Sequence, residues 1–275
     1  MTPLKPIEVF HDSFRIAELM LQLYRLLEND GLQTEGHLVS QVRSVLGAAE
    51  GEQLQLLLNP VFLGCIREQA GVPTATMRAP SLANLLRQAV ISACTAYETY
   101  LSAALKEHIF VVIEVRQNDF FPTEPEAAKY FEGLTLSIGE CFRLLNQQES
   151  PTLLGTKLLT FVQSKNLGSV AGMKTVGLLL GLDEPWNRVA EKLDRDVKDV
   201  RKVVAGCIER RNSIVHKGDR NIAEGSPEKQ AIAYAWTRQA VDTIGHACLA
   251  FDELVNAKIA EFQEVLDNNQ ERLHG

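Results

Sequence analysis

Hydrophobic residues recur every three or four positions along nearly every long segment of this chain, and that spacing is typical of amphipathic helices. Clusters of proline, glycine and asparagine separate the periodic segments and supply stop signals between them. We therefore expect an all-α fold. The predicted helices cover 14–27, 37–46, 52–69, a long segment from 81 to about 115, 137–147, part of 151–164, 185–215 and 228–266.

The stretch from Pro73 to Pro80 is rich in proline and threonine and resembles a linker. It divides the chain into an N-terminal helical region, residues 1–75, and a larger helical domain, residues 80–266. The total of 275 residues is sufficient for such a division and for a buried core.

The larger domain opens with the strongest helical pattern of the chain. Ser81 is the expected N-cap, and the segment Phe110–Val115, although β-branched, is interpreted as the end of this helix rather than a strand. The residues that share its predicted buried face are Leu82, Leu86, Ala89, Val90, Ala93, Tyr97, Tyr100, Leu101 and Ala104.

Two long helices are predicted in the last third. One starts after Asp183-Glu184-Pro185 and ends near Val215. The other starts at Ser226-Pro227-Glu228, where serine caps, proline takes the first helical position and glutamate favours the positive helix end. Its apolar seam consists of Val241, Ile244, Cys248, Phe251, Val255, Phe262 and Leu266.

The segment from Gly168 to Thr175 resembles a phosphate-binding loop, but that motif needs glycine directly before the lysine and Met173 stands there. We interpret the segment as a loop between helices.

The charge, the apolar runs and the cysteines of the chain limit the classes of function that it can have. The formal net charge is −7, which argues against a generally basic nucleic-acid-binding surface and leaves room for a local basic cleft. No apolar run reaches the length of a membrane span or resembles a secretion signal. The five scattered cysteines are interpreted as free thiols in a reducing cytoplasm.

The chemically informative segment is Glu209–Asp219. On the helix that precedes it, Arg211 falls in the middle of a buried stripe, where a guanidinium is unfavourable unless it is paired or faces a wet cleft. The stripe is formed by Leu193, Val197, Val200, Val204, Cys207 and Val215. Asn212 and His216 follow within two turns, and Gly218 is the expected helix-ending glycine. The alternative is a purely structural arginine, bonded to a buried carboxylate or to helix-end carbonyls.

The run Arg211-Asn212-Ser213-Ile214-Val215-His216 resembles the HEPN signature, an arginine followed after four to six residues by a histidine at a helix end. The upstream run Ala96–Leu101 resembles the first core helix of that family, and the spacing from Asp183-Glu184-Pro185-Trp186 to Arg211 is similar to the variety called RiboL-PSP-HEPN. The resemblance covers roughly 80–260 and implies a HEPN-like helical bundle preceded by an additional N-terminal helical region.

The resemblance also implies a metal-independent endoribonuclease. A ribose 2′-hydroxyl attacks the adjacent phosphorus, His216 handles a proton, and Arg211 binds the developing negative charge. Asn212 orients the phosphate or the imidazole, unless it is only a helix-end cap. By similarity Glu98 positions Arg211 or His216; the alternative is an ordinary solvated glutamate. Arg210 and Lys217 are candidates to steer the RNA backbone, unless they are merely solvated.

No cofactor is expected, and none of the other histidines is spaced with Cys, Asp or Glu as metal ligands are; these are His11, His37, His108, His246 and His274. The expected partners are RNA, a second copy of the chain and an antitoxin or regulatory protein, in a toxin–antitoxin or antiviral defence setting. The homodimer is expected because Arg211 and His216 lie about 140° apart on an ideal helix, which is awkward for gripping one phosphate from one chain. A catalytically silent HEPN domain that binds RNA or protein is the alternative.

Overall fold

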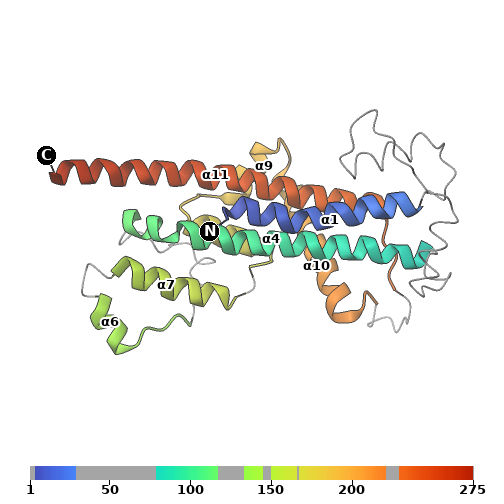
Figure 1. Cartoon of the computed structure of the whole chain (residues 1–275), viewed down its shortest axis with the longest axis horizontal. Helices are drawn as coiled ribbons and strands as arrows, with labels where there is room; N and C mark the ends of the chain where they lie inside the picture. The colour runs from blue at the N-terminus through green and yellow to red at the C-terminus, as the bar shows by residue number, and fades with distance from the viewer. Residues whose placement is uncertain are drawn as a thin grey trace, which may run out of the picture.

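The protein is all-α in the part that a computed structural model describes, residues 4–28, 79–116, 133–144, 150–165, 167–220 and 229–274 (Figure 1). Its helices are α1 (Pro6–Glu28), α4 (Ala79–Arg116), α6 (Ile138–Leu144), α7 (Ser150–Gln163), α8 (Val170–Leu179), α9 (Pro185–Lys192), α10 (Val197–Lys217) and α11 (Tyr234–His274). Within those ranges, the single bridge between Arg220 and Lys229 is the only β-type pairing. The predicted fold class is confirmed.

Three helices, α1, α4 and α11, lie side by side and form the body of the molecule (Figure 1). Tyr100 of α4 lies at the junction, with its ring edge-on to Phe10 of α1 and to Phe251 of α11. Gly245 of α11 lets α1 approach closely, because a Cβ there would meet the Phe14 ring at 2.7 Å. The described part of the N-terminal region thus packs into the same core as the helices after residue 79.

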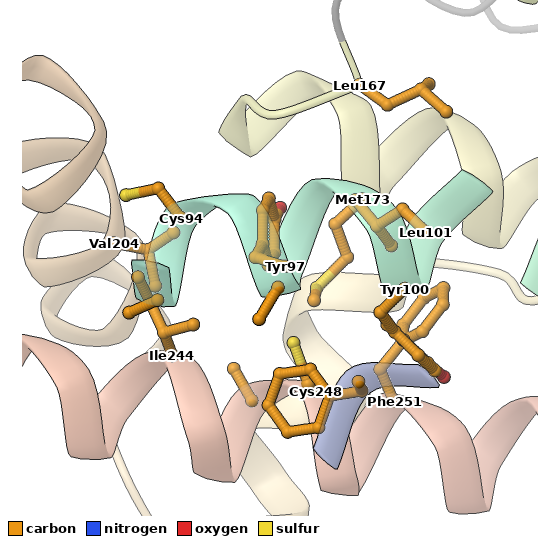
Figure 2. Close-up of a cluster of buried hydrophobic side chains, with 14 of the residues drawn as sticks. Cys94, Tyr97, Tyr100, Leu101, Leu167, Met173, Val204, Ile244, Cys248 and Phe251 are labelled. Atoms are coloured by element: carbon orange, nitrogen blue, oxygen red, sulfur yellow. The ribbon is translucent and has the colours of Figure 1, made fainter. Parts of the chain in front are cut away.

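The buried face predicted for α4 is confirmed, since all nine of its residues are buried. Figure 2 shows the centre of this core, where Tyr97 and Leu101 of α4 lie among Met173 of α8 and Cys248 of α11. The segment Phe110–Val115 is helical, as expected. Ser81 is not the N-cap, because the helix begins two residues earlier, at Ala79.

The interpretation of residues 168–175 as a loop is wrong, because most of the segment belongs to α8. Ser169 is the N-cap, and its side chain accepts a hydrogen bond from the backbone of Gly172. Gly172 itself packs against the backbone carbonyl of Leu167, where a Cβ would clash. The glycine therefore serves helix packing at this position.

The helix predicted from 185 to 215 is divided into α9 and α10 by a short break. Leu193 caps the end of α9, and Asp194 adopts a left-handed conformation at φ +51°. Asp196 then starts α10, because its carboxylate accepts hydrogen bonds from the backbone N–H groups of Lys198 and Asp199. The break turns α10 away from α9.

The last helix begins at Tyr234, so the start predicted at Ser226-Pro227-Glu228 is wrong. The helix ends at His274, beyond the predicted end at Leu266. Val241, Ile244, Cys248, Phe251 and Val255 of its seam are buried as expected, whereas Phe262 and Leu266 are only half-buried. The C-terminal part of α11 extends beyond the other helices (Figure 1).

Helix α10 leaves the bundle at a steep angle to α4 (Figure 1). The two helices meet at Cys94 and Cys207, whose sulfur atoms are 3.7 Å apart and buried. Small side chains at this crossing allow close approach, and the crossing determines which residues of α10 face α4.

Two predicted helices, 37–46 and 52–69, and the linker 73–80 fall wholly or mostly outside the described residues, so the domain boundary stays a prediction. In the part of the chain that the structure does describe, no helix combines the length and the apolar character that a membrane crossing requires.

Candidate functional site

Arg211 lies one helical turn beyond the crossing of α4 and α10 and faces Glu98, which lies one turn beyond Cys94 on α4. The Nη2 atom of Arg211 is 3.5 Å from Oε2 of Glu98, and the arginine side chain is 17% exposed. Glu98 is more open, at 40%. The prediction that Arg211 lies on a largely buried face is confirmed, and the structure brings Glu98 to it.

The guanidinium of Arg211 is incompletely satisfied. Its Nε and Nη2 atoms are buried and have no hydrogen-bond partner among the described residues, because the contact with Glu98 is an ion pair rather than a hydrogen bond. A buried donor without a hydrogen bond is unfavourable, and Arg87 Nη1 and Arg210 Nε share this state with the two Arg211 atoms. The charge of Arg211 also acts on Cys207: the contact with Cys94 and then burial raise the pKa of the Cys207 thiol, whereas Arg211 lowers it.

Arg210, the neighbouring arginine, has a different environment. Its Nε lies 2.9 Å from Oδ1 of Asp219, and its Nη2 donates to Oδ2 of the same carboxylate and to the carbonyls of Gln230 and Ala231. Arg87 of α4 donates from Nε to Asp219 at 2.6 Å and from Nη2 to the Gln230 carbonyl at 2.7 Å. These contacts hold Arg210 within the fold, and its expected role in steering RNA stays a prediction.

We call Arg87, Arg210, Asp219 and Gln230 the Asp219 clasp. It ties the turn after α10 to α4 and to the strand-like residues before α11. Asp219 is fully buried at φ +62°, directly after the C-cap Gly218 at φ +59°. Sequence reasoning missed the clasp; its only local signal was an acidic residue after a helix-ending glycine.

His216 and Lys217 lie in the last turn of α10 and are exposed to solvent. Asn212 is half-buried beside Arg211. Val215 was predicted to lie on the buried stripe, but it is 53% exposed, because the end of α10 extends past the helices that could cover it. Within one chain, Arg211 therefore faces α4 while His216 faces outward, as the helical spacing of five residues requires.

A surface groove of about 570 Å³ adjoins the Glu98 side of this pair. Thr95, Glu98, Thr99, Ser102, Ala103 and Lys106 of α4 form its floor, and Lys165 and Leu167 after α7 form its wall. The arrangement places a carboxylate, hydroxyl groups and ammonium groups around one solvent-open space, and the carboxylate is the ion-pair partner of Arg211. Such a set can bind a phosphate diester and oppose the charge that it gains during transfer.

Among the described residues, no three His, Cys, Asp or Glu side chains are placed to share a metal ion. Comparisons of the chain with protein-family models, with curated proteins and with solved structures found no match.

Proposed function

We propose that this protein is a metal-independent endoribonuclease with Arg211 and His216 at its centre. The single observation that carries the proposal is the state of Arg211, a largely buried guanidinium whose Nε and Nη2 make no hydrogen bond and whose ion-pair partner, Glu98, lines an open groove. Arg87 and Arg210 each also have one buried nitrogen without a hydrogen bond, but their other nitrogens donate to Asp219 and to carbonyl oxygens. The contrast favours an external anion as the partner of Arg211.

The proposed reaction is an internal transfer. The 2′-hydroxyl of a ribose loses its proton and attacks the adjacent phosphorus, the bond to the 5′-oxygen breaks, and that oxygen receives a proton. The products are a 2′,3′-cyclic phosphate and a 5′-hydroxyl. Arg211 binds the non-bridging oxygens as a planar fork, and His216 serves one of the two proton transfers because imidazole titrates near neutrality. Asn212 orients the phosphate, and Glu98 holds Arg211.

The resemblance of residues 80–260 to HEPN nucleases supports this reaction and a homodimer as the working unit. The outward direction of His216 agrees with a site in which each chain supplies its arginine to the histidine of the other. Val215 offers an exposed apolar side chain next to His216, and pairing of two α10 ends would cover it. An antitoxin or regulatory protein in a defence system is the context that the resemblance suggests.

The first test is cleavage of a single-stranded RNA by purified variants. Arg211→Ala and His216→Ala should each abolish cleavage, and Arg211→Lys should also fail because lysine lacks the bidentate fork. Arg201→Ala and His246→Ala, at exposed positions of α10 and α11, are matched controls that should cleave normally. Wild-type cleavage should persist in EDTA and stop when the scissile ribose carries a 2′-O-methyl group. Full activity of His216→Ala would remove histidine from the mechanism.

The second test addresses the shared site. Differently tagged Arg211→Ala and His216→Ala chains are co-expressed, and the heterodimer is purified. It retains one intact arginine and one intact histidine on opposite chains, so activity should return although both mutant homodimers are inactive. A fully active monomer at the assay concentration would contradict the shared site.

The ion pair with Glu98 favours a second candidate, a catalytically silent module that binds RNA or protein. In that case the carboxylate blocks the face of Arg211 that a phosphate would use. RNA binding without cleavage by the wild type, with tighter binding and still no cleavage in Glu98→Gln, would support this candidate over the first.

A further inference from the structure

The polar residues on the groove floor form a regular stripe along α4. Positions 95, 98 or 99, 102 and 106 are separated by three or four residues, so they lie on one face of the helix. The buried face of α4 lies on other positions, including Tyr97, Tyr100 and Leu101. From Glu98 to Lys106 the stripe extends about 12 Å at 1.5 Å per residue. From Glu98, the partner of Arg211, the stripe leads along α4 to Lys106.

Two positively charged side chains line the groove. Lys106 is exposed on the floor, and Lys165 is exposed on the wall. The ammonium group of Lys165 lies 4.9 Å from the centre of the Phe161 ring, which keeps it over the end of α7. In a chain of net charge −7, two lysines that converge on one groove next to a buried arginine form a local site for an anion.

We propose that this groove binds the ribose-phosphate backbone of single-stranded RNA to one side of the scissile phosphate, with Lys106 and Lys165 contacting successive phosphates. The inference rests on the proposed function, since it takes Arg211 as the point of cleavage. At about 3.4 Å per stacked nucleotide, the 12 Å from Glu98 to Lys106 correspond to roughly three nucleotides. The hydroxyl groups of Thr99 and Ser102 lie between and can donate to phosphate or 2′-hydroxyl oxygens.

The groove fits the backbone better than the bases. The described residues that line it include no aromatic ring on which a base could stack, and they include no asparagine or glutamine amide for reading a base edge. Binding through phosphates makes affinity depend on salt and not on sequence. The groove is therefore expected to position the RNA strand relative to Arg211 without reading its sequence. Other parts of the protein would then select the cleavage position.

The experiment measures binding separately from cleavage. A fluorescein-labelled single-stranded RNA of mixed sequence, 2′-O-methylated throughout, is titrated with the full-length protein, and anisotropy is recorded over a series of salt concentrations. The variants are Lys106→Gln, Lys165→Gln and the double variant. Lys202→Gln, at an exposed position of α10, is the matched control. Lys106→Arg and Lys165→Arg preserve the charge and test whether charge alone is needed.

Each lysine that neutralises a phosphate of a single strand changes the slope of log K against log salt by about 0.7, which corresponds to about fivefold in affinity near 0.1 M salt. Each glutamine variant should therefore bind about fivefold more weakly, and the double variant about 25-fold, with a slope smaller by about 1.4. The arginine variants should bind like the wild type. With cleavable RNA, the double variant should raise KM and leave kcat within about twofold.

The outcomes separate this inference from the proposed function. Wild-type binding and slope in the double variant would overturn the inference, even if the protein cleaves RNA. The predicted loss of binding in a protein that never cleaves RNA would support the groove and reject the nuclease. A comparable loss in Lys202→Gln would show non-specific attraction and would also overturn the inference.

Discussion

Removing the carboxylate of Asp219 tests whether Arg87 and Arg210 stabilise the fold, and it can be compared with removing Arg211, for which we propose a catalytic role. Asp219 is 0% exposed and bonds both Arg87 and Arg210, at 2.6 Å and 2.9–3.0 Å. Asp219→Asn leaves two guanidinium groups, both largely buried, facing a neutral amide. Asparagine tolerates the left-handed backbone at φ +62°, so the change tests charge and not backbone strain.

The expected destabilisation is about 3–5 kcal/mol, because breaking a buried ion pair from one side leaves uncompensated buried charge. That is a large fraction of the 5–15 kcal/mol that typically separates folded from unfolded domains. Arg211→Met keeps the apolar stem and removes only a 3.5 Å ion pair and unsatisfied nitrogens, so it should cost about 1 kcal/mol or less.

Urea unfolding followed by circular dichroism measures both free energies on the same scale. We expect a marked fall in the urea midpoint for Asp219→Asn and a midpoint close to wild type for Arg211→Met. If Asp219→Asn costs less than about 1 kcal/mol, the clasp does not stabilise the fold as described. If Arg211→Met costs as much as Asp219→Asn, Arg211 is a structural arginine and the proposed function loses its basis.

Three further measurements test other parts of the molecule. The hydrogen bond from Lys157 and those from Ser137 lower the pKa of Glu140 to about 2. The carboxylate should therefore stabilise the start of α6 fully above pH 4.5, and this stabilisation should be lost as the pH falls toward 2. An NMR titration should show the lowered pKa of Glu140, and Lys157→Ala should raise that pKa toward 4.5. In a Cys65→Ser protein, Cys141 should react rapidly with a thiol reagent and the three buried thiols only on unfolding, whereas rapid reaction of all four would contradict the packing of the core. Gly172→Ala would set a methyl group against a backbone carbonyl and should lower stability by about 2 kcal/mol in thermal unfolding; an unchanged midpoint would show that α8 shifts freely.

The helices that the sequence predicts well are those with long, regular apolar periods. The buried face of α4 could be predicted residue by residue, because core packing and helical spacing agree there. Helix ends were harder to predict: Ser81 and Ser226 have the chemistry of caps, but α4 begins at Ala79 and α11 begins at Tyr234. The break before α10 was hidden because Leu193 and Val197 continue the apolar spacing across it.

For the candidate site, the position of Arg211 on an inward face was predictable, since it depends on spacing within one helix. The contact with Glu98 was anticipated only through the family resemblance. The Asp219 clasp joins residues 132 positions apart, and nothing local to Arg87 indicates its partner. The burial of Val215 was predicted wrongly from helical spacing alone. Val215 lies on the apolar stripe of α10 but stays exposed, because the end of α10 extends past the helices that could cover it.

The crossing at Cys94 and Cys207 also acts as a pivot for everything farther along α10. Arg211 lies about 6 Å along the axis from that point and His216 about 13 Å, at 1.5 Å per residue. A tilt of roughly 5° about the crossing would displace the arginine backbone by about 0.5 Å and the histidine backbone by more than 1 Å. Errors of that size can change the rate of a positioned reaction by about 100-fold. Replacing either thiol with a larger side chain would therefore move His216 more than Arg211 relative to α4, so the volume of two core residues adjusts where both side chains lie.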